Sequence, residues 1–174
     1  DVVAGIGVAQ RIDKFVGLPT RSFGITITTY VSQNLGAGKP ERIKEGRNKV
    51  ILLSLIVAAG FSAPLYIFAE FWIGLFSQVP AVISAGAAML RTLLPFIAIP
   101  AMREVFTGLL RGYKVTFVPM VLNIIGMVVV RQIYLAICYV RGLRVEHIYM
   151  CYPIAWFAAS LFVFLYYLAV RKKL

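Results

Sequence analysis

The residues of this chain best suited to chemistry are ionisable side chains that lie inside long apolar stretches. They are Asp13, Arg21, Arg103, Glu104 and Arg131. An ionisable side chain at the middle of a bilayer costs at least about 2.5–3.5 kcal/mol, so such a residue is expected to face a cavity or a partner. A carboxylate there can take up a proton or a cation, whereas an arginine there needs an acidic or carbonyl partner.

Asp13 and Gly17 are four residues apart, so they share one face of a helix. Because Gly17 is small, another helix or a ligand can approach that face, and Arg21 stays near it. The pattern favours Asp13 as a proton or cation site and Arg21 as a gate. The alternative is an ion pair between Asp13 and a nearby Arg or Lys that only lines an outer vestibule.

Arg103 and Glu104 form the clearest charged pair inside an apolar stretch. On the functional interpretation, Glu104 titrates or receives a cationic substrate and Arg103 modulates it. On the alternative interpretation, the two residues are a charge pair near the cytoplasmic end of a helix and point to water or lipid head groups.

Further polar side chains lie in two of the apolar stretches. Hydroxyls in membrane helices often bond their own backbone or a neighbouring helix, so we expect most to pack and one or two, with Thr28 as the candidate, to contact substrate. Asn123 and Arg131 lie eight residues apart, roughly on one face of a helix. A structural hydrogen bond between helices is favoured for Asn123, and Arg131 is deep enough to need a partner.

The composition sets the class of protein that carries these residues. The chain has 174 residues, of which 60% are apolar and 14% charged, with a mean hydropathy of +0.84. Soluble domains are about 45–50% apolar and about 25% charged, so a disordered chain is excluded and a water-soluble globule is not expected. The formal charge of +11 then indicates cytoplasmic loops rather than a nucleic-acid partner.

The chain offers no recognisable catalytic or metal-binding pattern. It has no Ser-His-Asp set, no P-loop and no Gly-rich nucleotide motif. One histidine and two cysteines without a CxxC pair do not supply a standard zinc site. We therefore expect neither an enzyme nor a bound metal or cofactor.

The apolar stretches predict an all-α, polytopic membrane helix bundle, because a bilayer core needs roughly 20 apolar residues per helix. Five membrane helices are expected, at about 8–35, 50–69, 82–110, 115–140 and 148–170. Pro95 and Pro100 make the third of these the helix expected to bend. Gly36 and Gly38 follow the first helix, and we expect the Gly36-Ala37-Gly38 segment to hold the turn that ends it, with a glycine in a left-handed position.

Loop charges predict how the bundle is oriented. Ten Lys and Arg residues fall on the side that holds the first loop and the C-terminus, and two fall on the opposite side. The first loop and the C-terminus are therefore expected in the cytoplasm. Tyr149, Tyr152 and Trp156 are expected in the outer aromatic belt. Five helices that start outside, behind Asp1 rather than Met, suggest the back part of a longer protein.

Two motifs stand out in the sequence. The first comprises Gln33, Asn34, Gly36, Ala37, Gly38, Glu41 and Arg42, and the second comprises Gly108, Arg111 and Gly112. They resemble the "QNxGAGxxER" signature and the "GxLRGxxD" run of a known family, the multidrug and toxic compound extrusion (MATE) transporters. The upstream run Arg11–Phe15 with Pro19 resembles the matching helix of the C-terminal half, and the agreement in helix count extends over essentially all 174 residues.

The resemblance implies helices eight to twelve of a twelve-helix, two-lobed secondary antiporter. Its partners would be the N-terminal lobe of the same protein, the lipid bilayer and small cationic or amphiphilic drugs, exchanged for H⁺ or Na⁺ without another cofactor. The membrane would be the plasma membrane, the inner membrane in a bacterium. Pro100 stands where one branch has an ion-binding Asp, so the pattern resembles the DNA-damage-inducible branch, for which H⁺ coupling is the more usual proposal.

Two other functions stay open at this level. One is a lipid-linked oligosaccharide flippase of the same superfamily, whose groove would carry more Lys and Arg. The six basic residues inside the spans favour it, and the run Gln33–Arg42 weighs against it. The other is a non-transporting membrane assembly module.

Overall fold

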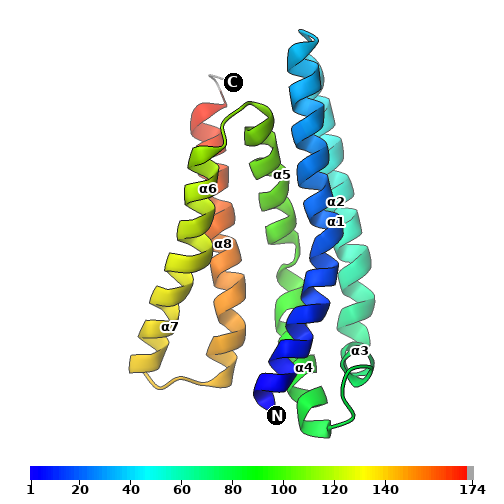
Figure 1. The fold of residues 1–174 in the computed structure, drawn as a ribbon, viewed down its shortest axis with the longest axis vertical. Coiled ribbons are helices and arrows are strands. Elements are labelled where there is room, and N and C mark those ends of the chain that lie inside the picture. Colours follow the sequence, from blue (N-terminus) through cyan, green and yellow to red (C-terminus); the bar gives the residue numbers. More distant parts are fainter. Residues whose placement is uncertain (172–174) are drawn as a thin grey trace.

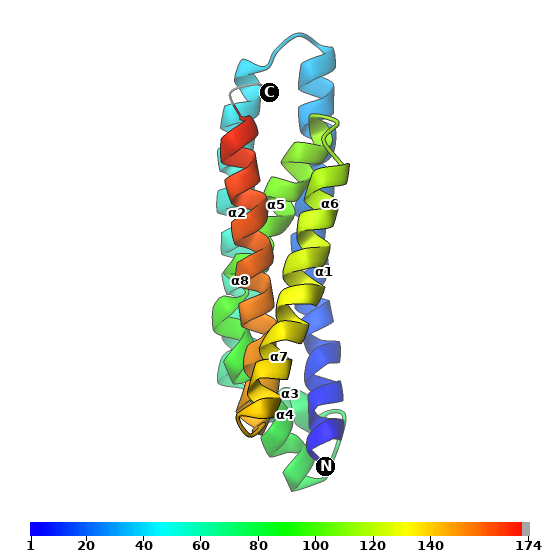
Figure 2. The same ribbon diagram turned by 90° about the vertical axis from the view of Figure 1, so that its left-hand side faces the viewer.

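Helices make up nearly all of the chain. The computed structural model describes residues 1–171 as an elongated helical bundle (Figures 1 and 2). In chain order the elements are α1 (Val2–Gly36), α2 (Glu41–Ile67), α3 (Ala69–Gly74), α4 (Pro80–Leu93), the 3₁₀ turn η1 (Leu94–Phe96), α5 (Ala98–Gly112), α6 (Phe117–Ile124), the π-helical turn η2 (Ile125–Val129), α7 (Val130–Val140) and α8 (Val145–Val170). The described residues contain no strand, which confirms the predicted all-α class.

The described part of the chain has three helices that are long and apolar enough to cross a membrane. They are α2, the continuous helix Phe117–Val140, and α8. A fourth crossing is formed if α4 with η1 and α5 count as one bent span. The chain is therefore an integral membrane bundle, and the predicted count of five spans stays a prediction.

The predicted span that does not meet this length-and-apolarity criterion is α1, which carries four charged side chains between residues 11 and 21. Arg11, Asp13, Lys14 and Arg21 interrupt its apolar surface. Its 35 residues make it about 52 Å long at 1.5 Å per residue, well beyond the roughly 30 Å of a bilayer core. Figure 1 shows α1 running the height of the bundle, and three of its charged side chains, Arg11, Lys14 and Arg21, are exposed.

The helix predicted over 82–110 is broken near its middle. The axes of Pro80–Phe96 and Ala98–Gly112 differ by 49°. Pro95 lies in η1 at this break, where a proline ring obstructs continuation of the preceding helix. Pro100 lies in the first turn of α5, where the missing N–H costs no helical hydrogen bond. The predicted bend is therefore present, and Pro95 rather than Pro100 accounts for it.

The turn after α1 is a Schellman motif centred on Gly38. Gly38 has φ +67°, its N–H donates to the carbonyl of Leu35, and the N–H of Lys39 donates to the carbonyl of Asn34. Gly36 is the last residue of α1 and does not have positive φ. The turn predicted for the Gly36-Ala37-Gly38 segment is therefore present, and Gly38 is its left-handed residue, because the helix continues through Gly36 and reverses two residues later.

The connections alternate between the two ends of the bundle. The α1–α2 turn, the α5–α6 turn and the last residues of α8 lie at one end, which we call the Gly38 end (Figure 1). The short helix α3 and the α7–α8 turn lie at the other, the α3 end (Figures 1 and 2). This arrangement matches the two sides inferred from loop charges.

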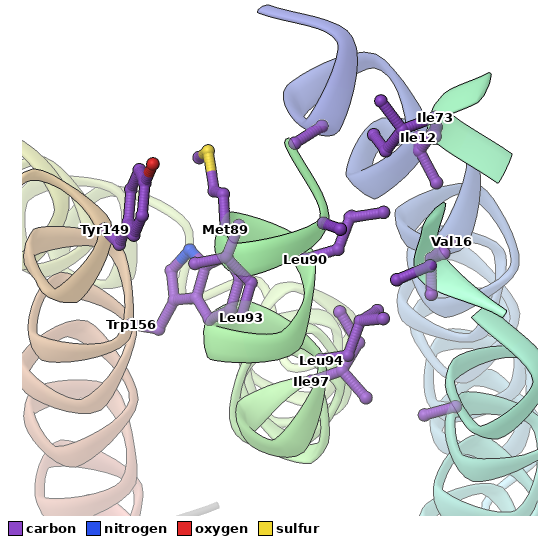
Figure 3. Packing of buried hydrophobic residues seen from close by; sticks show 14 of the residues in the cluster. Ile12, Val16, Ile73, Met89, Leu90, Leu93, Leu94, Ile97, Tyr149 and Trp156 are labelled. Carbon is purple, nitrogen blue, oxygen red and sulfur yellow. The ribbon is translucent and has the colours of Figure 1, made fainter. Parts of the chain in front are cut away.

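Two hydrophobic clusters hold the helices together. In the first, Tyr149 and Trp156 of α8 lie beside Met89 and Leu93 of α4, and Leu90 and Leu94 face Ile12 and Val16 of α1 (Figure 3). The second joins α1, α2, α5 and α8 and centres on buried side chains that include Ile27, Val31, Val105, Leu109 and Val163.

A line of small residues lets α1 approach α4 and α5 closely. We call it the small-residue seam, and it consists of Gly5, Gly24, Gly86, Gly108 and Gly112. A Cβ on Gly108 would overlap the carbonyl of Gly24, and a Cβ on Gly112 would lie 2.5 Å from Cβ of Val31. Small residues at such an interface allow the backbones to pack directly, which is the usual source of helix association in membranes.

Candidate functional site

A π-helical turn decides which residues of the fourth predicted helix face the centre of the bundle. Ile125–Val129 form this turn between α6 and α7. Its wider winding lets eight residues complete about two turns, so Asn123, Met127 and Arg131 share one face. Gly126 lies in the turn and packs so tightly on Ala159 of α8 that a Cβ would overlap the Ala159 backbone.

A polar cavity of about 220 Å³ lies between α1, α5, the α6–α7 helix and α8. We call it the central cavity. It begins at the α4–α5 bend, because Ile97 and Pro100 form part of its wall. Its ionisable lining residues are Asp13, Lys14, Arg21, Arg103, Glu104 and Arg131, and the other lining residues are Gly17, Thr20, Ile97, Pro100, Met127, Tyr152 and Trp156.

The central cavity brings together five of the seven candidate pathway residues. Asp13, Arg21, Arg103, Glu104 and Arg131 come from three separate predicted helices and all contribute to one wall. Their meeting depends on the α4–α5 bend, which the prolines predicted, and on the π turn, which residue spacing did not predict.

Asp13 enters the cavity without a partner. Its Oδ1 atom is buried and accepts no hydrogen bond, and none of the ion pairs among the described residues includes Asp13. Gly17, one turn later, lines the same wall and has nothing within 4 Å of the position that a Cβ would take. The shared face of Asp13 and Gly17 is thus open, and the alternative ion pair with a nearby Arg or Lys is not formed.

Arg103 and Glu104 pair with each other. Arg103 Nη2 lies 2.7 Å from Glu104 Oε1, and the two side chains are 13% and 22% exposed. They are therefore largely covered by protein rather than directed to water or head groups. Arg103 also has a buried Nε with no hydrogen-bond partner, so one donor remains unused.

Arg131 is held by an aromatic ring. Its Cζ lies 4.1 Å from the centre of the Tyr152 ring, a favourable cation–π distance. The Tyr152 hydroxyl accepts a hydrogen bond from the Gln10 amide, which ties α8 to α1. Within the described residues Arg131 is therefore supported by an aromatic face, and the acidic or carbonyl partner expected for it stays a prediction.

Tyr152 and Trp156 are functional-site candidates that sequence reasoning missed. Both were expected in the lipid-facing belt with Tyr149, yet Tyr149 and Trp156 are 6% exposed and Tyr152 is partly buried. Their spacing of four residues places both on the face of α8 that lines the cavity. That spacing was the available signal, and only the packing of α8 against α4 and α1 decides that the face is interior.

An open groove of about 400 Å³ adjoins the central cavity and shares Arg103, Glu104 and Met127 with it. Asn123 lies in this groove and donates hydrogen bonds to the Pro119 carbonyl at 2.8 Å and to Thr107 Oγ1 at 3.4 Å. The second bond joins α6 to α5, in agreement with the structural role favoured for Asn123.

Thr28 lines neither the cavity nor the groove. Its hydroxyl lies 2.8 Å from the carbonyl oxygens of both Gly24 and Gly108, so it can donate to its own helix or across to α5. Thr28 therefore contributes a hydrogen-bonding group at the small-residue seam.

The signature residues lie mainly where helices end or pack. Asn34 donates to the Tyr30 carbonyl at 2.8 Å, and Gly38 forms the turn. Gln33, Gly36, Ala37, Glu41 and Arg42 are exposed at the Gly38 end. Gly108 and Gly112 belong to the seam, and Arg111 reaches the adjoining groove.

The central cavity can bind charged groups, and its donor set does not resemble a metal centre. Among residues 1–171, no group of three or more His, Cys, Asp or Glu side chains gathers around a common point. Two carboxylates, four cationic side chains and two aromatic rings can instead exchange a proton or hold a charged organic group.

Comparison with known proteins identifies relatives of this chain. A family model described as MatE matches residues 1–137. Probable multidrug resistance protein YpnP of Bacillus subtilis is 26% identical over 99% of this chain, which covers 38% of YpnP. Multidrug resistance protein PmpM of Pseudomonas aeruginosa is 28% identical over 71% of the chain and 26% of PmpM. Protein DETOXIFICATION 18 of Arabidopsis thaliana is 33% identical over 62% of the chain and 23% of that protein.

The chain thus spans well under half the length of these relatives, while the family model extends over α1 to α7, which include most of the residues around the central cavity. Motifs, helical fold and family model agree, and the chain belongs to the MatE family.

Proposed function

We propose that the chain forms helices eight to twelve, the C-terminal lobe, of an antiporter that exports cationic or amphiphilic compounds in exchange for H⁺ or Na⁺. The observation that carries the proposal is the unpartnered carboxylate of Asp13 in a polar cavity between membrane helices. The relatives named multidrug resistance proteins also support this proposal. The rest of the transporter would supply the facing lobe.

Asp13 is the coupling carboxylate in this proposal. Glu104 already has a cationic partner 2.7 Å away, so taking up a proton there would break an ion pair. Asp13 has no such partner, and its carboxylate can take a proton without that loss. Pro100 occupies the cavity wall where one MATE branch is expected to carry an Asp, which favours H⁺ over Na⁺.

The break between α4 and α5 supplies the moving part. A helix broken by a 49° bend at a 3₁₀ turn has lost part of its hydrogen-bond ladder and can change angle at low cost. Such a change would shift Arg103 and Glu104 relative to Asp13 and so connect proton uptake to the opening of the cavity. Arg21, which is exposed at the cavity wall, acts as the gate.

The transport proposal is tested by neutralising each carboxylate in the full-length transporter. Asp13→Asn is expected to abolish proton-driven efflux from proteoliposomes, while Glu104→Gln reduces it less. Both variants are expected to insert normally, as judged by the amount of protein in the membrane. Wild-type efflux by Asp13→Asn across pH 6 to 8 would place the coupling carboxylate outside this lobe.

The proposed orientation places the Gly38 end in the cytoplasm of a cell whose plasma membrane, the inner membrane in a bacterium, holds the protein. Its support is the excess of Lys and Arg in the first loop, the α5–α6 turn and the C-terminus. Lys172 and Lys173 contribute to that count and lie outside the described residues.

Cysteine labelling tests the orientation. In full-length protein without its native cysteines, Gln78→Cys should react with an impermeant reagent added outside, and Lys39→Cys should not. The reverse pattern would overturn the topology.

A further inference from the structure

Arg131 has no role in the proton exchange proposed above. Its guanidinium lines the central cavity over the Tyr152 ring, and none of the ion pairs among residues 1–171 includes it. Glu104 is paired with Arg103 instead. A permanently charged side chain between membrane helices with no paired acid points to a charged ligand.

The position of Arg131 is fixed in advance. The ring that supports it is tied to α1 through Gln10, and the π turn aims Arg131 toward the cavity. A guanidinium that lies over a ring keeps N–H donors around its edge, where they match the oxygens of a carboxylate or phosphate. Little ordering cost is then left for the moment of binding.

The charge of the cavity also favours an anion. Four cationic side chains line it, namely Lys14, Arg21, Arg103 and Arg131, against two carboxylates, Asp13 and Glu104. Arg103 adds a buried Nε donor that no described residue accepts. One negative group would therefore offset part of the cationic excess and meet an unused donor.

Size limits what this group can be. A drug-sized ligand needs a pocket of about 300–1,000 Å³, and the central cavity has about 220 Å³. It suits a head group rather than a whole molecule. The adjoining groove of about 400 Å³ shares Arg103 and Met127 with it and continues along Met120, Ile124 and Val128, which offers apolar surface for the remainder of an amphiphile.

We propose that Arg131, assisted by Arg103 Nε, binds the phosphate or carboxylate head of an anionic amphiphile whose apolar part lies along this groove. The proposal rests on the proposed function in that the central cavity is the transport site. It extends the substrates of that site beyond cations and makes Arg131 the residue that selects for a negative head group.

Binding to the full-length transporter in phosphatidylcholine nanodiscs tests this directly. The probes are decyl phosphate and decyltrimethylammonium, which share a tail and differ in the charge of the head. Arg131→Gln is expected to weaken the binding of decyl phosphate at least tenfold. The affinity for decyltrimethylammonium should stay unchanged or increase. Arg131→Lys should restore only part of the loss, because an ammonium lacks the planar donor edge.

Arg11→Gln provides the matched control. Arg11 is exposed on α1 and does not line the cavity, so its loss should leave both probes unaffected. An equal fall in the affinity for both probes in Arg131→Gln would mean that Arg131 only supports the fold. Unchanged binding of decyl phosphate would mean that Arg131 does not contact the head group. Either result overturns the proposal.

Nanodiscs that contain phosphatidylglycerol then distinguish the source of the anion. Competition between this lipid and decyl phosphate at Arg131 identifies a lipid head group as the occupant, and absence of competition identifies a free amphiphile. Proton-driven efflux of decyltrimethylammonium is measured in parallel. A protein without such efflux but with Arg131-dependent binding of decyl phosphate would refute the proposed antiport and leave the anion site standing.

Discussion

Helix α1 passes through two regions that are built in opposite ways. At the small-residue seam, Gly24 and Gly108 bring two backbones together and Thr28 bonds across the contact, which leaves no room for an added Cβ. At the central cavity, Gly17 faces open space and the Oδ1 atom of Asp13 has no hydrogen-bond partner. The same helix is thus closely packed at Gly5 and Gly24 and open and polar at Asp13 and Gly17, which lie between them.

The difference separates residues that pack the helices from residues that we propose to act in transport. In a membrane, close contact between small residues stabilises helix pairs, whereas a buried polar group without a partner destabilises the fold and needs a functional explanation. Seam substitutions should therefore change stability, and cavity substitutions should change activity with a smaller effect on stability.

The largest expected effect is at the centre of the seam. Gly108→Ala in the full-length protein should lower the free energy of unfolding by about 1–3 kcal/mol through overpacking, because the new Cβ meets Ile27 at 2.8 Å and the Gly24 carbonyl. Gly7→Ala is the control, since nothing lies within 4 Å of its Cβ position, and it should be neutral or stabilising. Chemical denaturation in detergent measures both. Equal stability of the two variants would contradict the close packing of the helix backbones at the seam.

Within the cavity, the two carboxylates should behave differently from each other. Glu104→Gln should cost about 1–2 kcal/mol of stability, less than the 3–5 kcal/mol for a fully buried pair, because the side chains of the broken pair are 13% and 22% exposed. Asp13→Asn breaks no pair and should stay within about 0.5 kcal/mol. Together with the efflux assay, this predicts that stability depends more on Glu104 and activity more on Asp13. A stability loss confined to Asp13→Asn would contradict the expected difference between the two carboxylates.

The α5–α6 turn carries a small strain that can be relieved. Lys114 has φ 64° in a Schellman turn after α5, where the N–H of Val115 donates to the carbonyl of Leu110. Because a left-handed conformation costs a side-chain-bearing residue about 1–2 kcal/mol, Lys114→Gly should raise thermal stability by about 1 kcal/mol. Lys39→Gly, at a position without positive φ, should give no gain. A gain at both positions would exclude the backbone explanation.

The smallest expected effect concerns one hydrogen bond in the seam. Thr28→Val keeps the shape of the side chain and removes the hydroxyl that lies 2.8 Å from the Gly108 carbonyl. Hydrogen bonds between membrane helices contribute about 0.6 kcal/mol on average, so a loss of that size is expected, with efflux unchanged. The control is Thr29→Val, because Thr29 is exposed and bonds only within α1. Altered substrate preference in Thr28→Val would place this residue in the pathway after all.

Residue spacing predicted several features that the structure contains. Periods of apolar residues predicted the helices, Pro95 predicted the bend, and the glycines after α1 predicted a turn. Gly36 and Gly38 could not be distinguished, because the residue that turns left-handed depends on where the helical hydrogen bonds stop. Tyr152 and Trp156 were placed at the lipid surface, because an aromatic residue near a helix end suits either a belt or a packed interface.

The sequence by itself determined the class of the protein, since apolar periodicity and low charge admit only a membrane helix bundle, and two motifs pointed to its family. Only the tertiary structure decided which polar residues meet. The α4–α5 bend, the π turn at Gly126 and the rotation of α8 bring Asp13, Arg103, Glu104 and Arg131 around one cavity. The bend was expected from Pro95 and Pro100, whereas the π turn and the orientation of α8 depend on contacts between helices far apart in the chain, which residue spacing within a single helix does not encode.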